Sequence, residues 1–105
     1  MRQAIITKWH GPTNTKGSRV RATAAAGAVT QHWDWALNPE ANHAQAAIAL
    51  ATKYGWSGWW AAGGMPAEAG NCYVWVAAIE DEPTIYGTEG VDWFLVPDQH
   101  AHGRA

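Results

Sequence analysis

Alternation of apolar and polar residues predicts three consecutive β-strands in the first third of the chain. The segments 3–9, 18–24 and 28–35 are each rich in β-branched or aromatic residues and repeat with a period of two. The loop 11–17, "GPTNTKG", and a short Ala-Gly turn separate them. Three strands joined by such short connections are expected to form an antiparallel meander.

The same alternation predicts which side chains share a face of each strand. In the first strand, Ile5, Thr7 and Trp9 fall on one side, with Ala4, Ile6 and Lys8 on the other. In the second strand, Val20, Ala22 and Ala24 are expected inward. Arg19, Arg21 and Thr23 are then expected on the outward face.

A helix is expected directly after these strands. Asn38 is a suitable N-cap, Pro39 suits the first helical position and Glu40 the first turn. Lys53 would lie in the last turn, and Gly55 is placed to end the helix. An apolar stripe at spacings of three and four is expected to face the sheet: Ala44, Ala47, Ile48, Ala51 and Tyr54.

Two more strands are expected at 56–62 and 72–79, paired as a hairpin, with a further edge strand in the apolar run "VDWFLV". The order βββ-α-ββ, with this possible extra strand, predicts an α+β fold: an antiparallel sheet with one helix packed on one face. With 105 residues, one domain is expected, over 1–97. The remainder, 98–105, is expected to be a flexible C-terminal tail.

Eight tryptophans in so short a chain exceed what one core requires. Some are therefore expected on the surface, where tryptophan is typical of binding sites. Trp59 and Trp60 are consecutive in an expected strand, so their side chains should point in opposite directions.

Charge is distributed unevenly, although the net charge is only −2. Residues 1–33 hold five basic residues and no acidic one, whereas residues 66–98 hold seven acidic residues and no basic one. This asymmetry indicates a two-faced protein, an acidic tail folded against a basic face, or an ordinary mixed surface with chance clustering.

Motifs for catalysis or cofactor binding are absent from the sequence. It has neither a nucleophile elbow nor a glycine-rich phosphate loop, and its single cysteine excludes an internal disulfide. Two weak leads for a metal site, His32 with Asp34 and Asp98 with His100 and His102, are not joined by a further ligand group at a recognisable spacing, so no metal site is expected. No run reaches transmembrane length, and we expect a cytoplasmic, non-enzymatic protein without a cofactor.

One hypothesis for function is single-stranded nucleic-acid binding by the N-terminal hairpin. Its cations would hold phosphates while Trp9, Trp33 or Trp35 offers a stacking surface for bases. The residues of this hypothesis are Lys8, Trp9, Lys16, Arg19 and Arg21.

The competing hypothesis is a protein–protein interface with an aromatic centre and a charged rim. Its residues are Trp33, Trp35, Trp59, Trp60, Glu80, Asp81 and Glu82. Surplus aromatic residues also make a homodimer possible, through an edge strand.

The segments "AIITKWHGPTNTKGSRVRATA" and "WDWALNPEANHAQAAIALATKYGW", followed by a Gly-rich turn and "YVWV", resemble a family of small uncharacterised phage and plasmid proteins of proteobacteria. The resemblance ends near residue 78 and brings no catalytic residues. It implies a mobile-element protein that acts by binding, of an anti-CRISPR-like kind. The leading expectation is therefore an inhibitor that occludes a host protein or ribonucleoprotein complex, ahead of single-stranded nucleic-acid binding and of a small enzyme or metal protein.

Overall fold

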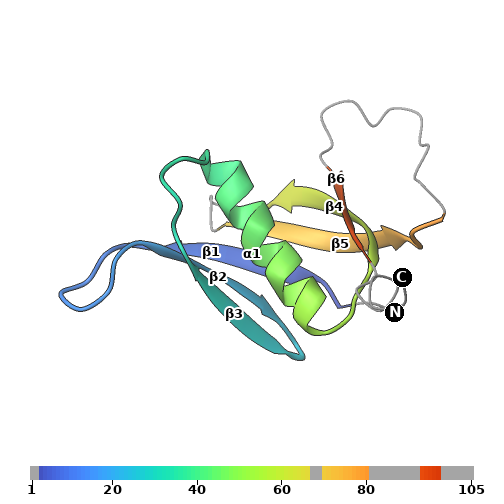
Figure 1. Cartoon of the computed structure of the whole chain (residues 1–105), viewed down its shortest axis with the longest axis horizontal. Coiled ribbons are helices and arrows are strands. Elements are labelled where there is room, and N and C mark those ends of the chain that lie inside the picture. Colours follow the sequence, from blue (N-terminus) through green and yellow to red (C-terminus); the bar gives the residue numbers. More distant parts are fainter. Residues whose placement is uncertain (1–2, 67–69, 81–92, 98–105) are drawn as a thin grey trace, which may run out of the picture.

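A computed structural model describes residues 3–66, 70–80 and 93–97. Within these residues the chain forms one helix and six strands, and Figure 1 shows the helix lying across one face of the sheet. The predicted α+β fold is confirmed. The elements are β1 (Ile5–His10), β2 (Arg19–Ala24), β3 (Gly27–His32), α1 (Pro39–Lys53), β4 (Gly58–Gly64), β5 (Asn71–Ala77) and β6 (Trp93–Val96).

The strands form one sheet in the order β3-β2-β1-β5-β4-β6, and each neighbouring pair is antiparallel. The expected meander of the first three strands and the later hairpin of β4 with β5 are both confirmed. The edge strand expected in "VDWFLV" is also present: β6 pairs with β4 at the end of the sheet opposite β3.

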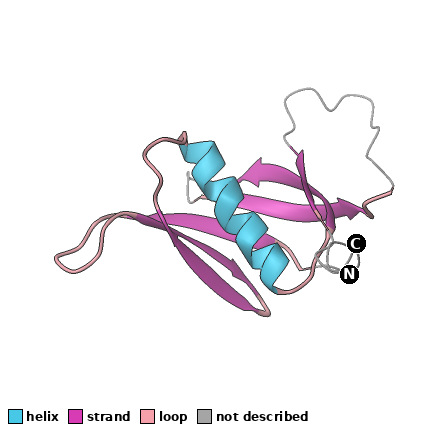
Figure 2. Cartoon of the chain, viewed as in Figure 1, coloured by secondary structure: helices cyan, strands magenta, loops and turns pink. Residues whose placement is uncertain are grey.

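The helix begins and ends where its local signals predict. The Asn38 side chain accepts a hydrogen bond of 2.7 Å from the Ala41 backbone, with Pro39 in the first turn. At the other end Gly55 has a φ of +69°, a conformation that glycine adopts without strain. The helix packs mainly on β1, β2 and β3, so the molecule has two layers, as Figure 2 shows.

The core lies between the helix and the sheet and contains many alanines. The small side chains bring the helix axis close to the strands, and the aromatic rings fill the rest of the space. Trp60 is fully buried and stacks on Trp56, with ring centroids 6.3 Å apart, and Trp56 stacks on Tyr54 at 5.2 Å. The fully buried apolar residues are Ile5, Val20, Ala22, Ala46, Ala47, Leu50, Ala51, Trp60, Tyr73 and Val96.

Two sequence predictions are wrong in detail. The third strand ends at His32 and not at residue 35, because the chain turns away from the sheet at Asp34. The buried stripe of the helix also differs from the predicted one: Ala46 and Leu50 are fully buried, whereas Ala44 and Ile48 are half-buried, and two polar residues join the stripe. Asn42 and His43 are buried there because both side chains find hydrogen-bond partners inside the protein.

The faces predicted for β1 and β2 agree with the structure. Ile5 and Thr7 are buried beneath the helix, as are Val20 and Ala22, and Arg21 is exposed. The sheet face opposite the helix is called the open face below. The expected tail, 98–105, lies outside the described residues. Among the described residues, no helix is long and apolar enough to cross a membrane.

Candidate anion-binding groove

Basic side chains gather on the open face because of the alternation of β2. Val20 and Ala22 point toward the helix and are buried, so Arg19 and Arg21 project from the opposite face. The Arg21 side chain is exposed and that of Arg19 is half-buried.

Strand register brings further cationic or ionisable groups beside these two arginines. Lys8 on β1 lies opposite Arg21, and His10 lies opposite Arg19. On the other side of β2, Arg19 faces His32 of β3. Residues directly opposite one another in neighbouring strands share a face of the sheet. All five side chains therefore belong to the open face.

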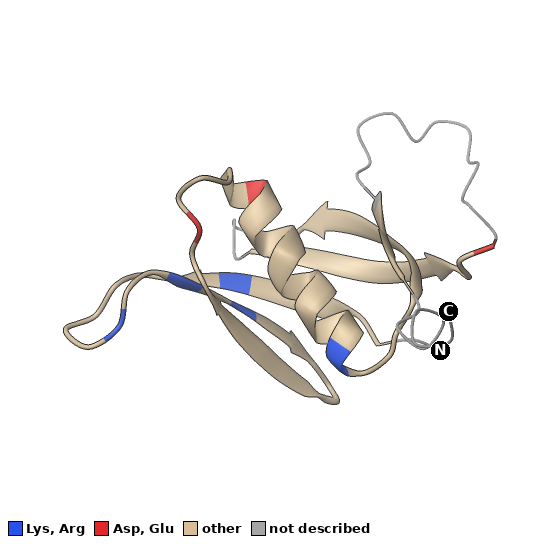
Figure 3. Ribbon diagram, viewed as in Figure 1, with Lys and Arg blue, Asp and Glu red and all other residues tan. Residues whose placement is uncertain are grey.

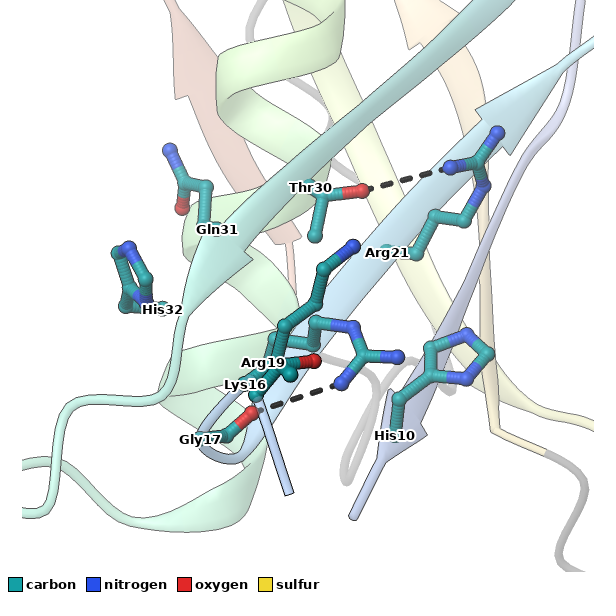
Figure 4. A pocket seen from close by; sticks show the side chains of 9 residues that line it. His10, Lys16, Gly17, Arg19, Arg21, Thr30, Gln31 and His32 are labelled. Carbon is teal, nitrogen blue, oxygen red and sulfur yellow. Dashed lines mark hydrogen bonds between the residues drawn. The ribbon is translucent and has the colours of Figure 1, made fainter. Parts of the chain in front are cut away.

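A groove of about 490 Å³ lies over this part of the sheet. The side chains around it, drawn in Figure 4, come from three strands and the β1–β2 loop. This basic groove is lined by His10, Thr15, Lys16, Gly17, Arg19, Arg21, Thr30, Gln31 and His32.

Lys16 reaches the groove from a loop that a compact turn holds in place. The Thr13 hydroxyl accepts a hydrogen bond of 3.0 Å from the Lys16 backbone N–H, and the Thr13 N–H donates to the Lys16 carbonyl at 2.6 Å. This turn keeps the Lys16 backbone close to the start of β2, beside Arg19.

Each arginine contacts neutral acceptors in the groove. One Arg19 nitrogen lies 3.4 Å from the Gly11 carbonyl oxygen and 3.5 Å from that of Gly17, and Arg21 donates to the Thr30 hydroxyl at 3.4 Å. A guanidinium has five N–H donors. Both arginines therefore retain donors for an anion.

Within the part of the chain that the structure describes, no carboxylate lines the basic groove. Among the described residues the acidic ones are Asp34 in the loop before the helix, Glu40 in its first turn and Glu80 after β5. Figure 3 shows the acidic positions near the start of the helix and beyond β5, away from the groove. Like charges opposite one another in a sheet are destabilising. The arrangement of Lys8, Arg19 and Arg21 thus favours a ligand that supplies negative charge.

The residues of the nucleic-acid hypothesis are only partly brought together. Lys16, Arg19 and Arg21 line one groove, and Lys8 lies beside Arg21. Trp9 does not line this groove: it is 48% exposed and lines a separate cleft on the helix side of the sheet. Sequence reasoning missed His10 and His32, which only the pairing of β1 and β3 with β2 places here.

The residues of the protein-interface hypothesis are more scattered. Trp60 is fully buried and offers no surface to a partner, which corrects its assignment to an interface. Trp59 is half-buried, and its indole N–H donates to the Ile79 carbonyl at 3.2 Å. Trp33 and Trp35 lie in the loop after β3, where Trp35 is 79% exposed. Glu80 is exposed, whereas Asp81 and Glu82 lie outside the described residues.

No group of three or more His, Cys, Asp or Glu side chains that could hold a metal ion occurs in the described part of the chain. His100 and His102, considered as metal ligands above, lie beyond it.

Comparison with known proteins gives no match: no family model, curated protein or solved structure is similar to the chain. The resemblance to mobile-element proteins therefore stays a prediction.

Proposed function

We propose that the protein is a small, non-enzymatic binding protein that holds the phosphate backbone of single-stranded nucleic acid in the basic groove. The observation that carries this proposal is the pairing of cation with cation across β1 and β2, in a groove that no carboxylate of the described residues lines. A bound phosphate would relieve that repulsion and accept charge-assisted hydrogen bonds from Arg19 and Arg21.

The size of the basic surface favours a single strand over a duplex. Four cations, Lys8, Lys16, Arg19 and Arg21, are available, and the net charge of the chain is −2. Duplex binders generally spread more positive charge along a longer surface. A flexible strand can instead bend into a groove of about 490 Å³ and place a few phosphates near these side chains.

Salt dependence tests the proposal directly. With four phosphate contacts, the logarithm of the affinity should fall against the logarithm of salt with a slope of about −2.8, roughly 50-fold between 50 and 200 mM. The measurement is fluorescence anisotropy of labelled oligo-dT and oligo-U. Affinity that does not change with salt, or no binding at micromolar protein, would overturn the proposal.

A pair of matched variants assigns the site. Arg21→Gln removes a groove cation, whereas Lys53→Gln removes an exposed cation at the far end of the helix. Arg21→Gln should weaken binding and make the salt slope less steep by about 0.7. Lys53→Gln should leave both the affinity and the slope nearly unchanged. Equal effects of the two variants would point to general charge attraction and not to this groove.

A second candidate function, binding to a host protein or ribonucleoprotein complex, is favoured by the other half of the open face. Three apolar side chains are exposed there: Ile6 (43%), Val74 (51%) and Leu95 (38%). Such a partner would be occluded by an apolar surface with the basic groove at its rim. A defence complex of the CRISPR type is the partner that the resemblance to mobile-element proteins implies.

Retention of a purified candidate complex on immobilised protein tests this second function. Val74→Ser should release the complex, while Thr23→Ser, an exposed change on the same face, should not. If both variants retain the complex as well as the wild type does, the apolar half is not the contact surface.

A further inference from the structure

Three tryptophans meet in a cleft on the helix side of the sheet. Trp9 comes from the end of β1, and Trp33 and Trp35 come from the loop that joins β3 to the helix. Pro39 and His43 of the helix complete the walls of this aromatic cleft, whose volume is about 350 Å³.

The rings are held in place although they are accessible. Trp33 lies edge-on to Trp35, with centroids 6.3 Å apart at 64°, and edge-on to His43 at 6.0 Å and 87°. Trp9 packs over Gly11, where an added Cβ would lie 3.1 Å from the indole. Trp9 is nevertheless 48% exposed and Trp35 79% exposed. Exposed indoles with fixed orientation are typical of ligand sites and are costly as plain surface.

Two acidic residues are sequence neighbours of residues that line the cleft. Asp34 lies between Trp33 and Trp35 in the chain, and Glu40 follows Pro39 and acts electrostatically on His43. Burial lowers the pKa of His43, which favours its neutral form. The start of the helix contributes about +0.5 of a charge, which is less than the two carboxylates contribute.

Positive side chains lie elsewhere in the described part of the chain. Figure 3 shows them on β1, β2 and the loop between these strands, with Lys53 at the opposite end of the helix. None of the lysines and arginines that the structure describes lines the cleft. The two sides of the β1–β3 meander therefore differ in charge: the basic groove suits an anion, and the aromatic cleft suits a cation.

We propose that the aromatic cleft binds the quaternary ammonium group of a small solute of the choline class. The faces of indole rings attract cations, and tryptophan does so most strongly of the aromatic side chains. A compact, methylated cation also loses little hydration when it enters an apolar cleft, and Asp34 and Glu40 add long-range attraction. Phosphates are disfavoured by the same carboxylates. This proposal does not rest on the nucleic-acid function.

The charge of the ligand can be tested with an isosteric pair. Choline and 3,3-dimethyl-1-butanol have nearly the same shape, but only choline is charged. Titrations followed by calorimetry and by tryptophan fluorescence should show choline binding at least tenfold more tightly. Equal binding of the two would show that the cleft is an apolar pocket that does not recognise charge, and this would contradict the proposal. No binding of choline at millimolar concentration would also overturn it.

Variants assign the binding to these residues. Trp35→Ala should abolish choline binding, whereas Leu37→Ala, a nearby exposed apolar residue that does not line the cleft, should not. Trp35→Phe keeps an aromatic face and should bind several-fold more weakly. Circular dichroism checks that each variant is folded.

Two further experiments test the role of the carboxylates and the kind of molecule that carries the ammonium group. Asp34→Asn and Glu40→Gln keep the size of each side chain and should each weaken choline binding several-fold. Unchanged affinity in both would contradict the role of charge. Tighter binding of a trimethyllysine peptide or of a nucleoside than of choline would assign the cleft to a macromolecule and overturn the small-solute proposal.

Discussion

The side chain of Asn42, buried in the first turns of the helix, makes two hydrogen bonds to the backbone of Asp34. Its carbonyl oxygen accepts from the Asp34 N–H at 2.8 Å, and its amide nitrogen donates to the Asp34 carbonyl at 3.0 Å. The same amide lies within 3.3 Å of the carbonyl oxygens of Leu37 and Asn38. One buried side chain thus joins the tryptophan-bearing loop to the helix.

We predict that Asn42→Asp destabilises the protein. An aspartate can accept from the Asp34 N–H, but it cannot donate to the three carbonyls and would bury a charge among them. The loss should be about 1–3 kcal/mol of the free energy of unfolding, measured by chemical denaturation. Asn14→Asp makes the same change in the exposed β1–β2 loop and should have an effect below about 0.5 kcal/mol. A loss no larger at Asn42 than at Asn14 would mean that these hydrogen bonds contribute little.

Trp60 and Trp35 should respond very differently to truncation. Trp60 is fully buried, and its N–H donates to the Trp56 carbonyl at 3.2 Å, so Trp60→Ala should cost about 3–5 kcal/mol. Trp35 is 79% exposed, and Trp35→Ala should change stability by less than about 1 kcal/mol. Thermal or urea unfolding of the two variants provides the comparison. Similar losses would show that Trp35 is held in the core and is not a surface residue.

Gly70 is a position where only glycine fits. Its φ is +122°, and a Cβ there would collide with the Thr7 carbonyl oxygen of the neighbouring strand. Gly70→Ala should therefore cost at least about 1–3 kcal/mol from backbone strain, and more if β1 and β5 separate. Gly64→Ala is the control, because a Cβ at Gly64 has no atom within 4 Å. Both are measured by equilibrium unfolding, and equal stability of the two variants would contradict the predicted collision.

The elements of this fold were predictable where their signals are local. Asn38, Pro39 and Gly55 each act on the backbone within a few residues, so the ends of the helix follow from the sequence. The end of β3 does not follow from the sequence in this way. It depends on a hydrogen bond between the Asp34 backbone and the side chain of Asn42, which lies eight residues later in the chain. A pattern of apolar positions also cannot identify a polar side chain that is buried with its own partners.

The basic groove was partly predictable, because some of its residues are brought together by alternation along a single strand. Alternation in β2 places Arg19 and Arg21 together, and alternation in β1 places Lys8 and Trp9 on opposite faces, although the nucleic-acid hypothesis combines them. His10 and His32 join the groove only through the register of three strands. Trp9 meets Trp33 in the aromatic cleft only because the loop after β3 folds over the end of β1. Contacts of this kind depend on tertiary structure that no local pattern encodes.

The last prediction concerns pH and follows from the contact between Thr7 and His43. The Thr7 hydroxyl lies 2.7 Å from the His43 ring nitrogen Nδ1, and both side chains are buried. Burial lowers the pKa of His43 below its ordinary value of 6.5, and the negative charge of Glu40 opposes this in part. The unfolded chain therefore takes up a proton at a higher pH than the folded protein does.

Stability should consequently be highest above pH 6.5 and should decrease as the pH falls below it, until His43 is protonated in the folded state as well. One such group can change the free energy of unfolding by at most about 1.4 kcal/mol per pH unit. Urea unfolding from pH 7.5 to 4.5, compared between the wild type and His43→Gln, isolates this group from the other histidines. The difference between the two proteins should favour the wild type more at pH 7.5 than at pH 5. If the wild type instead gains relative stability as the pH falls, the attraction of Glu40 outweighs burial, and the folded protein holds a charged His43.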